Sequence, residues 1–240
     1  MRSVATLIVA IAAAAAWSGI AVAPVAAGSC TYTFPPEGGT YPGVVHDGDV
    51  LCGGPGDDVV DRMIGGRFNG SGGRDSVYFL IGGTFNGGPG DDTASRFRGG
   101  TFNGGEGNDY SMVMVGGTFN GGPGSDIVRA LDGDATFNGG LGDDGVGHLY
   151  EKGTFNGGRG DDSVVFVYDG TFNGGPGNDS VTFLGDIGVG PGLRDGTFNG
   201  GRGDDIVGTM LGRAFHGGGG IDSVVTYLSG ECSSVVNCPR

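Results

Sequence analysis

The chain is poor in positive charge. Its 240 residues include 13 Lys and Arg against 27 Asp and Glu, which gives a formal net charge of −14 at pH 7. Nucleic acid and anionic membrane surfaces repel a chain this acidic, so neither is an expected partner. The excess of acidic residues favours the binding of cations instead, and the placement of the Asp residues indicates where cations would bind.

Residues suited to an α-helix are also scarce. Gly accounts for 58 residues and Pro for 10, and Gly costs about 0.8–1.0 kcal/mol at an interior helical position relative to Ala. This composition is typical of low-complexity or disordered chains. However, 37% of the residues are hydrophobic and recur at fixed offsets, which indicates a folded protein.

Long apolar runs are confined to the N-terminus. Residues 1–27 combine a basic tip, an apolar run and a stretch of small residues, which predicts a secretory signal peptide cleaved after Ala27. No later stretch is apolar enough to span a bilayer. We therefore expect a secreted, extracellular protein, which could be associated with the cell surface, and no membrane insertion of the mature chain.

Cysteine is limited to four residues: Cys30, Cys52, Cys232 and Cys238. An even number in an exported chain indicates two disulfides. We predict the pairs Cys30–Cys52 and Cys232–Cys238, in an N-terminal cap at 28–49 and a C-terminal cap at 229–240, although the sequence leaves the other two pairings open. Lipidation of Cys30 is an alternative. Two features disfavour it: the preceding "AGS" is a poor match to a lipoprotein signal, and lipidation would leave an odd number of cysteines. Capped ends favour a monomer.

The region between the caps is a repeat. The phrase "TFNGGPGDDT" at 84–93 has close copies, and ten acidic turns of the form GGxGxD follow one another in steps of 17 or 18 residues, with one step of 26 that carries an insertion near 185–195. Apolar residues lie two and five positions after the last Asp of each turn. A third column consists of Phe68, Phe85, Phe102, Phe119, Phe137, Phe155, Phe172, Phe198 and Phe215.

One repeat is too small to bury three apolar side chains, but stacked repeats can cover one another. The sequence therefore predicts an all-β fold over 50–228, a right-handed parallel β-roll or β-helix solenoid of about ten coils. Each coil would contain two short strands and two turns, with neighbouring coils about 4.7–4.9 Å apart. Gly supplies the positive φ that such sharp turns require.

Stacking places one Asp of every turn in register on one edge: Asp58, Asp75, Asp92, Asp109, Asp126, Asp144, Asp162, Asp179, Asp205 and Asp222. A second acid precedes it in five turns, as Asp57, Asp91, Asp143, Asp161 and Asp204. Charges about 4.8 Å apart repel by roughly 3–4 kcal/mol per pair at an effective dielectric constant near 20. The column therefore needs protons, water or bound cations.

Bound Ca²⁺ fits this chemistry best. Carboxylates and turn carbonyls are hard oxygen ligands, which suit the six to eight ligands of Ca²⁺, whereas Mg²⁺ prefers to keep its waters. Zinc is disfavoured because His46, His148 and His216 are scattered and the cysteines lack metal-ligand spacing.

Ten copies of GGxGxD followed by x-apolar-x resemble the RTX nonapeptide of calcium-binding parallel β-rolls, and the resemblance covers 53–228. It implies Ca²⁺ between the turns of successive coils. The final Asp of each turn and carbonyls of turn glycines such as Gly53, Gly87 and Gly104 would be ligands. The preceding acids would be ligands as well.

Three features depart from that family. Only one turn per coil is acidic, so we expect a single file of Ca²⁺. Arg74, Ser125 and Ile221 replace the usual Asp or Asn before the final Asp, which should weaken those sites. The N-terminal signal also differs from the C-terminal export signal of many members. Without metal, repulsion and glycine entropy should leave the chain largely unfolded until it meets calcium outside the cell.

An enzyme is not expected, because the segments outside the repeats are too short for a catalytic domain. The main hypothesis is a secreted calcium-binding repeat protein. The alternative is an ice-binding or surface-adhesion solenoid, because Thr and Asn on either side of each inward Phe would form two outward ladders. Sugar binding would need exposed aromatics, and Tyr32, Tyr41, Tyr78, Tyr110, Tyr150 and Tyr168 show no clear cluster in the sequence.

Overall fold

The computed structural model describes residues 29–185 and 196–235. The predicted signal peptide, nearly all of the insertion near 185–195 and Cys238 lie outside the described residues. The strands are β1 (Tyr32–Thr33), β2 (Gly39–Val45), β3 (Val50–Cys52), β4 (Asp58–Asn69), β5 (Ser76–Pro89), β6 (Thr93–Phe97), β7 (Thr101–Glu106), β8 (Tyr110–Met114), β9 (Thr118–Pro123), β10 (Ile127–Leu131), β11 (Thr136–Leu141), β12 (Gly145–Leu149), β13 (Thr154–Arg159), β14 (Ser163–Val167), β15 (Thr171–Pro176), β16 (Ser180–Gly185), β17 (Thr197–Arg202), β18 (Ile206–Gly219) and β19 (Ser223–Ser233).

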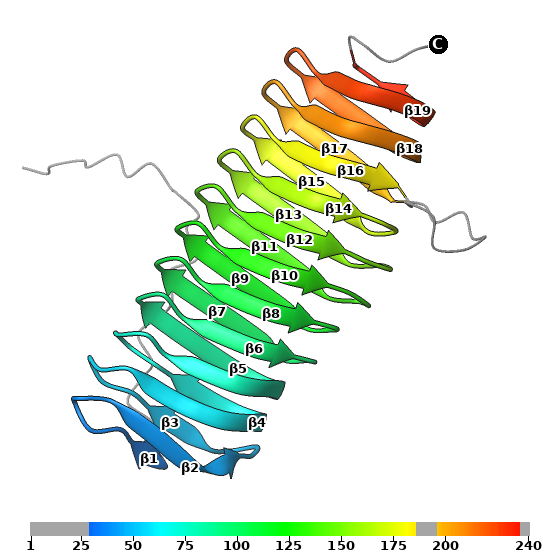
Figure 1. The fold of residues 1–240 in the computed structure, drawn as a ribbon. Coiled ribbons are helices and arrows are strands. Elements are labelled where there is room, and N and C mark those ends of the chain that lie inside the picture. The colour runs from blue at the N-terminus through cyan, green and yellow to red at the C-terminus, as the bar shows by residue number, and fades with distance from the viewer. Residues whose placement is uncertain (1–28, 186–195, 236–240) are drawn as a thin grey trace, which may run out of the picture.

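The strands stack coil upon coil into an elongated solenoid (Figure 1). Each strand pairs in parallel with the equivalent strand of the next coil, so that Val77 lies opposite Ala94 and Phe85 opposite Phe102. The described residues contain no helix. The prediction of an all-β parallel solenoid is thus confirmed, with about 11 turns and a repeat of about 17 residues.

The additional turn comes from the segment expected to be an N-terminal cap. Strand β2 pairs with β4, and β1 pairs with β3, which pairs in turn with β4. At the other end, β19 continues the stack, with Cys232 opposite Phe215 of β18. Both ends therefore extend the coil geometry into the segments that were expected to cap it.

The core consists of the three predicted apolar columns. The Phe rings from Phe68 to Phe215 lie parallel, with centroids 4.5–5.0 Å apart and interplanar angles of 3–15°. This separation matches the spacing of paired strands, so ring stacking and backbone pairing favour the same register. Ser111 occupies a place in the Val column and is buried, and its hydroxyl donates to the carbonyl of Ala94 at 2.9 Å.

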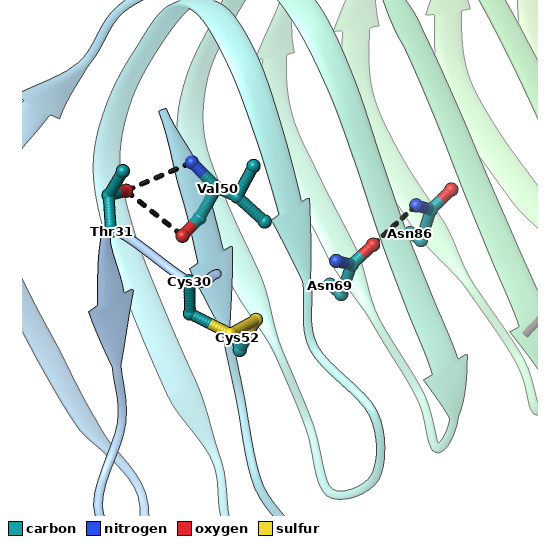
Figure 2. The surroundings of a disulfide bond; sticks show 6 residues. All are labelled: Cys30, Thr31, Val50, Cys52, Asn69 and Asn86. Carbon is teal, nitrogen blue, oxygen red and sulfur yellow. Dashed lines mark hydrogen bonds between the residues drawn. A yellow bond between two sulfur atoms is a disulfide. The ribbon is translucent and has the colours of Figure 1, made fainter. Parts of the chain in front are cut away.

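A side-chain ladder runs along the strands of the TFN phrase. The Nδ2 group of each Asn donates to Oδ1 of the Asn one coil earlier at 2.7–2.8 Å. The first bond, from Asn86 to Asn69, is drawn in Figure 2. These bonds are made only when equivalent residues lie opposite one another, because a shifted register would bring each Asn opposite a different side chain. The ladder therefore selects one register.

Both kinds of turn, the acidic one and the opposite one, contain Gly at positive φ, as predicted. In the acidic turn, Gly88 and Gly90 have φ of 116° and 142°, and in the opposite turn Gly83 has φ of 83°. Only Gly adopts these angles without steric strain. The step of 26 residues does not interrupt the stack, because the main-chain N–H of Asp179 donates to Oδ1 of Asp205 at 2.8 Å.

The predicted disulfide between Cys30 and Cys52 is confirmed (Figure 2). Its Cα atoms are 5.9 Å apart, and the neighbouring Thr31 binds Val50 through both its hydroxyl and its main-chain N–H. The second predicted pair involves Cys238, outside the described residues. Its predicted partner, Cys232, is disulfide-bonded.

Candidate metal centre

The final Asp of each acidic turn points into the solenoid. All ten of these residues, from Asp58 to Asp222, are at most 1% exposed. From Asp75 onward, Oδ1 of each accepts a hydrogen bond of 2.7–3.0 Å from the main-chain N–H of the equivalent Asp one coil earlier. We call these ten residues the inner Asp column. They form a continuous ladder through the length of the repeat.

Each inner carboxyl has one oxygen without a hydrogen-bond partner. This atom is Oδ2 from Asp75 to Asp222 and Oδ1 in Asp58, and it is buried in every case. A buried polar atom without a partner is costly, especially one that can carry negative charge. Ten such atoms in register point to a common unmet requirement for a proton or a cation.

The unpartnered oxygen lies against the first Gly of its own turn. A Cβ built on Gly87 would overlap Oδ2 of Asp92 and lie 2.6 Å from the carbonyl oxygen of Gly104 in the next coil. A Cβ on Gly70 would meet Asp75 and the Gly87 carbonyl in the same way. The absence of a side chain thus leaves a space bounded by a carboxyl oxygen and a main-chain carbonyl oxygen.

Burial raises the pKa of nine inner carboxyls, from Asp58 to Asp205, more than their hydrogen bonds to main-chain N–H groups lower it. The pKa reaches about 8 for Asp109 and Asp144 and about 6 for Asp126. It is raised to about 7 for Asp75, Asp92, Asp162, Asp179 and Asp205, and is also raised for Asp58. Neighbouring carboxylates add a smaller upward effect at most of them. Near neutral pH the metal-free column is therefore partly protonated.

The preceding acids form a separate, outer Asp column: Asp57, Asp91, Asp143, Asp161 and Asp204. They are exposed or half-exposed. Each Oδ1 accepts a hydrogen bond of 2.7–2.9 Å from the N–H of the equivalent residue one coil later, and Asn108 and Asn178 do the same. Asp91 also forms an ion pair with Arg74 at 3.1 Å. The structure therefore separates the two acids of each pair, one inside and one in solvent.

Within residues 29–185 and 196–235, no three Asp, Glu, His or Cys side chains converge to form a metal-binding group. Any ion beside an inner Asp would depend on that carboxylate and on main-chain carbonyls. The structure places the carbonyls of Gly87 and Gly104 beside unpartnered carboxyl oxygens, but gives no such contact for the Gly53 carbonyl. These donors are all hard oxygens, so the donor set fits a cation such as Ca²⁺ in chemistry.

The sequence analysis missed one set of half-buried aromatic residues. Tyr150 and Tyr168, judged to be unclustered, stack with centroids 5.0 Å apart, and His148 and Phe166 stack beside them, also 5.0 Å apart. The spacing of 18 residues between Tyr150 and Tyr168 was the available signal, because it equals the local length of the repeat.

No family model matches the chain, and neither the curated proteins nor the solved structures include a detectable match. The resemblance to RTX repeats therefore remains a prediction based on the motif. No helix able to cross a membrane occurs in the part of the chain that the structure describes.

Replacing the first Gly of an acidic turn should destabilise the protein for steric reasons alone. Gly87→Ala places a methyl group where Oδ2 of Asp92 lies, so we expect a loss of about 1–3 kcal/mol in the free energy of unfolding, typical of overpacking. Gly145→Ala is the matched control, because its Cβ would have no neighbour closer than 3.6 Å. Urea titration measures both variants, and equal stabilities would contradict the proposed overlap.

In EDTA, stability should fall as the pH rises from about 4 to about 8. Unfolded carboxyls ionise near their ordinary pKa of 3.8, whereas the eight inner carboxyls from Asp75 to Asp205 keep their protons in the folded state up to about pH 6–8. Over this interval the folded state binds more protons, so raising the pH favours unfolding. The urea midpoint measured across this range checks the expectation, and a midpoint that rises with pH in EDTA would contradict it.

Proposed function

We propose that this chain is a secreted calcium-binding solenoid in which the inner Asp column and adjacent turn carbonyls hold a file of Ca²⁺ ions. The observation that carries the proposal is the repeated unpartnered carboxyl oxygen, buried beside the carbonyl of the next coil. A chance cluster of acids would not leave one buried carboxyl oxygen without a partner in each of ten successive turns.

Charge explains why a cation suits the column. An ionised carboxylate in a buried position is strongly disfavoured unless it is paired. Two states relieve this cost: the proton bound to each carboxyl, or a divalent cation shared between coils. The second requires ionised carboxylates, so metal binding would release protons and strengthen as the pH rises. When bound, Ca²⁺ would supply positive charge beside oxygens that otherwise have no partner.

Export would then be coupled to folding. Because each coil buries one carboxyl, the free energy of folding is less favourable for a chain without calcium. The ordering of many Gly residues adds an entropic cost. Extracellular calcium sites commonly bind at about 10⁻⁴–10⁻³ M, a range suited to folding outside the cell. The disulfide between Cys30 and Cys52 is typical of an oxidising compartment and supports this location.

Adjacent substitutions in one turn test the assignment of the inner column. Asp144→Asn replaces a buried carboxyl by a neutral amide of similar shape, so it should stabilise the metal-free protein at pH 8, where the carboxylate is disfavoured. The same change should lower the number of calcium ions bound or their affinity. Urea titration in EDTA and calorimetric titration with calcium measure the two effects.

Asp143→Asn is the matched control, because this neighbouring carboxyl belongs to the outer Asp column and Asn already occupies the equivalent place at Asn108 and Asn178. It should change calcium binding much less than Asp144→Asn. A protein that binds no calcium at millimolar concentration would overturn the proposal.

A second candidate, ice binding or surface adhesion, is favoured by the TFN strands. Thr residues of successive coils lie opposite one another, as in Thr101 with Thr118 and Thr136 with Thr154. The Asn ladder beside them is held by hydrogen bonds, so the Thr and Asn array is regular and preorganised. Thermal hysteresis of the calcium-loaded protein tests this candidate, and Thr136→Lys should lower any activity; an absence of hysteresis excludes ice binding.

A further inference from the structure

The two outward faces of the solenoid differ in chemistry. The TFN strands present Thr and Asn, whereas the strands that follow the acidic turns present large apolar side chains. Six of them, clustered in the first five repeats, are 38–48% exposed: Ile64, Ile81, Met112, Val113, Val115 and Ile127. We call the outward surface of residues 59–64, 76–81, 93–98, 110–115, 127–132, 145–150, 163–168, 180–184, 206–211 and 223–228 the apolar face. Exposed apolar side chains gathered on one surface are typical of an interaction site.

The apolar face has two unlike halves. Toward the N-terminus, the guanidinium groups of Arg62 and Arg96 lie 5.1 and 5.3 Å from the ring centroid of Phe79, on either side of it in the stack. Arg98 and Arg129 add further positive charge to this half, and the four Arg residues outnumber its two acids, Asp61 and Asp132. A cationic surface is unexpected on a chain with a net charge of −14, so its placement needs an explanation.

Toward the C-terminus, the same column has no Arg; it contains three aromatic rings and ends in Thr209 and Thr226. His148, Phe166 and Phe183 occupy successive coils of the column that contains Arg62, Phe79 and Arg96. Their rings stack with centroids 5.0–5.1 Å apart. Arg guanidinium groups and aromatic rings attract one another, so the two halves are complementary.

We propose that the apolar face is the interface of a homodimer in which two copies pack face to face with their long axes antiparallel. A two-fold axis along the strands, placed so that the first eight coils of the two copies overlap, brings Arg62 and Arg96 of one copy opposite Phe183 and His148 of the other, twice. A parallel arrangement would instead place Arg62 and Arg96 against the same residues of the second copy. Charge therefore selects the antiparallel arrangement.

The size of the face suits a stable dimer. Eight overlapping coils spaced about 4.8 Å apart, with about five residues per strand at roughly 3.3 Å each, give a face of about 630 Å². A stable interface buries about 600–1,000 Å² on each partner. The segments predicted as caps do not oppose this arrangement, because β2 and the end of β19 extend the stack at its two ends.

The same symmetry places the acidic turns of both copies along one side of the pair. Packed sheets lie about 10 Å apart, so the two outer Asp columns would repel each other across this distance at low salt. Screening reduces such repulsion, while apolar contacts persist. The dimer should therefore tighten as the salt concentration rises, the opposite of a complex between the Arg residues and a polyanion.

Sedimentation of the purified protein over a concentration series tests the proposal. The experiment is done in millimolar calcium, so that its outcome does not depend on whether the fold requires metal. We expect a monomer–dimer equilibrium that Ile127→Arg and Val113→Arg each weaken by about tenfold or more, which corresponds to about 1.4 kcal/mol. Arg at position 113 is compatible with the fold, since Arg96 occupies the same column one coil earlier.

Leu141→Arg is the matched control. Leu141 is 48% exposed, as Ile127 is, but it lies in an acidic turn off the apolar face, and Arg159 occupies the equivalent place one coil later. Far-ultraviolet circular dichroism verifies that each variant is folded. The proposal is overturned by a monomer at all concentrations, by equal weakening in Leu141→Arg, by a dimer that salt weakens, or by a monomer that binds heparin through this face.

Discussion

The structure depends on the burial of one carboxyl group per coil. The main-chain N–H of each inner Asp donates to the carboxyl of the equivalent residue one coil on, which ties the acidic turns together where sheet hydrogen bonds alone would leave them loose. The same burial makes the negative charge costly. The stability of the fold and the charge of the inner Asp column thus depend on the same carboxyl groups. Any proton or cation that neutralised these groups would also stabilise the stacked coils.

Parallel stacking in a fixed register extends this constraint to every other position. Like side chains meet along each column, so Phe stacks on Phe, Asn binds Asn and carboxyl follows carboxyl. Such repetition multiplies the effect of each contact in the repeat, because a favourable contact recurs along the stack and so does an unfavourable one. On the outer surface the columns need not repeat, and the mixed Arg and aromatic column of the apolar face shows where the sequence varies between coils.

Much of the fold could be predicted because the periodicity is strict. The spacing of Phe85 and Phe102 gives the repeat length, and Gly88 and Gly90 indicate the tight turn. The candidate site was predicted only in part. Asp143 and Asp144 were both expected to be ligands, but the structure puts one in solvent and the other in the interior, because consecutive residues of an extended turn project to opposite sides.

The sequence by itself determined the repeat, the three buried columns and the register, because each depends on residue type at a fixed spacing, whereas it left the pairing of Cys30 with Cys52 as one of three possibilities. Only the tertiary structure decided which carboxyl oxygen has no partner, how far burial raises each pKa, and that Tyr150 lies against Tyr168. These properties depend on the direction of side chains and on the atoms around them in neighbouring coils, which a linear pattern does not contain.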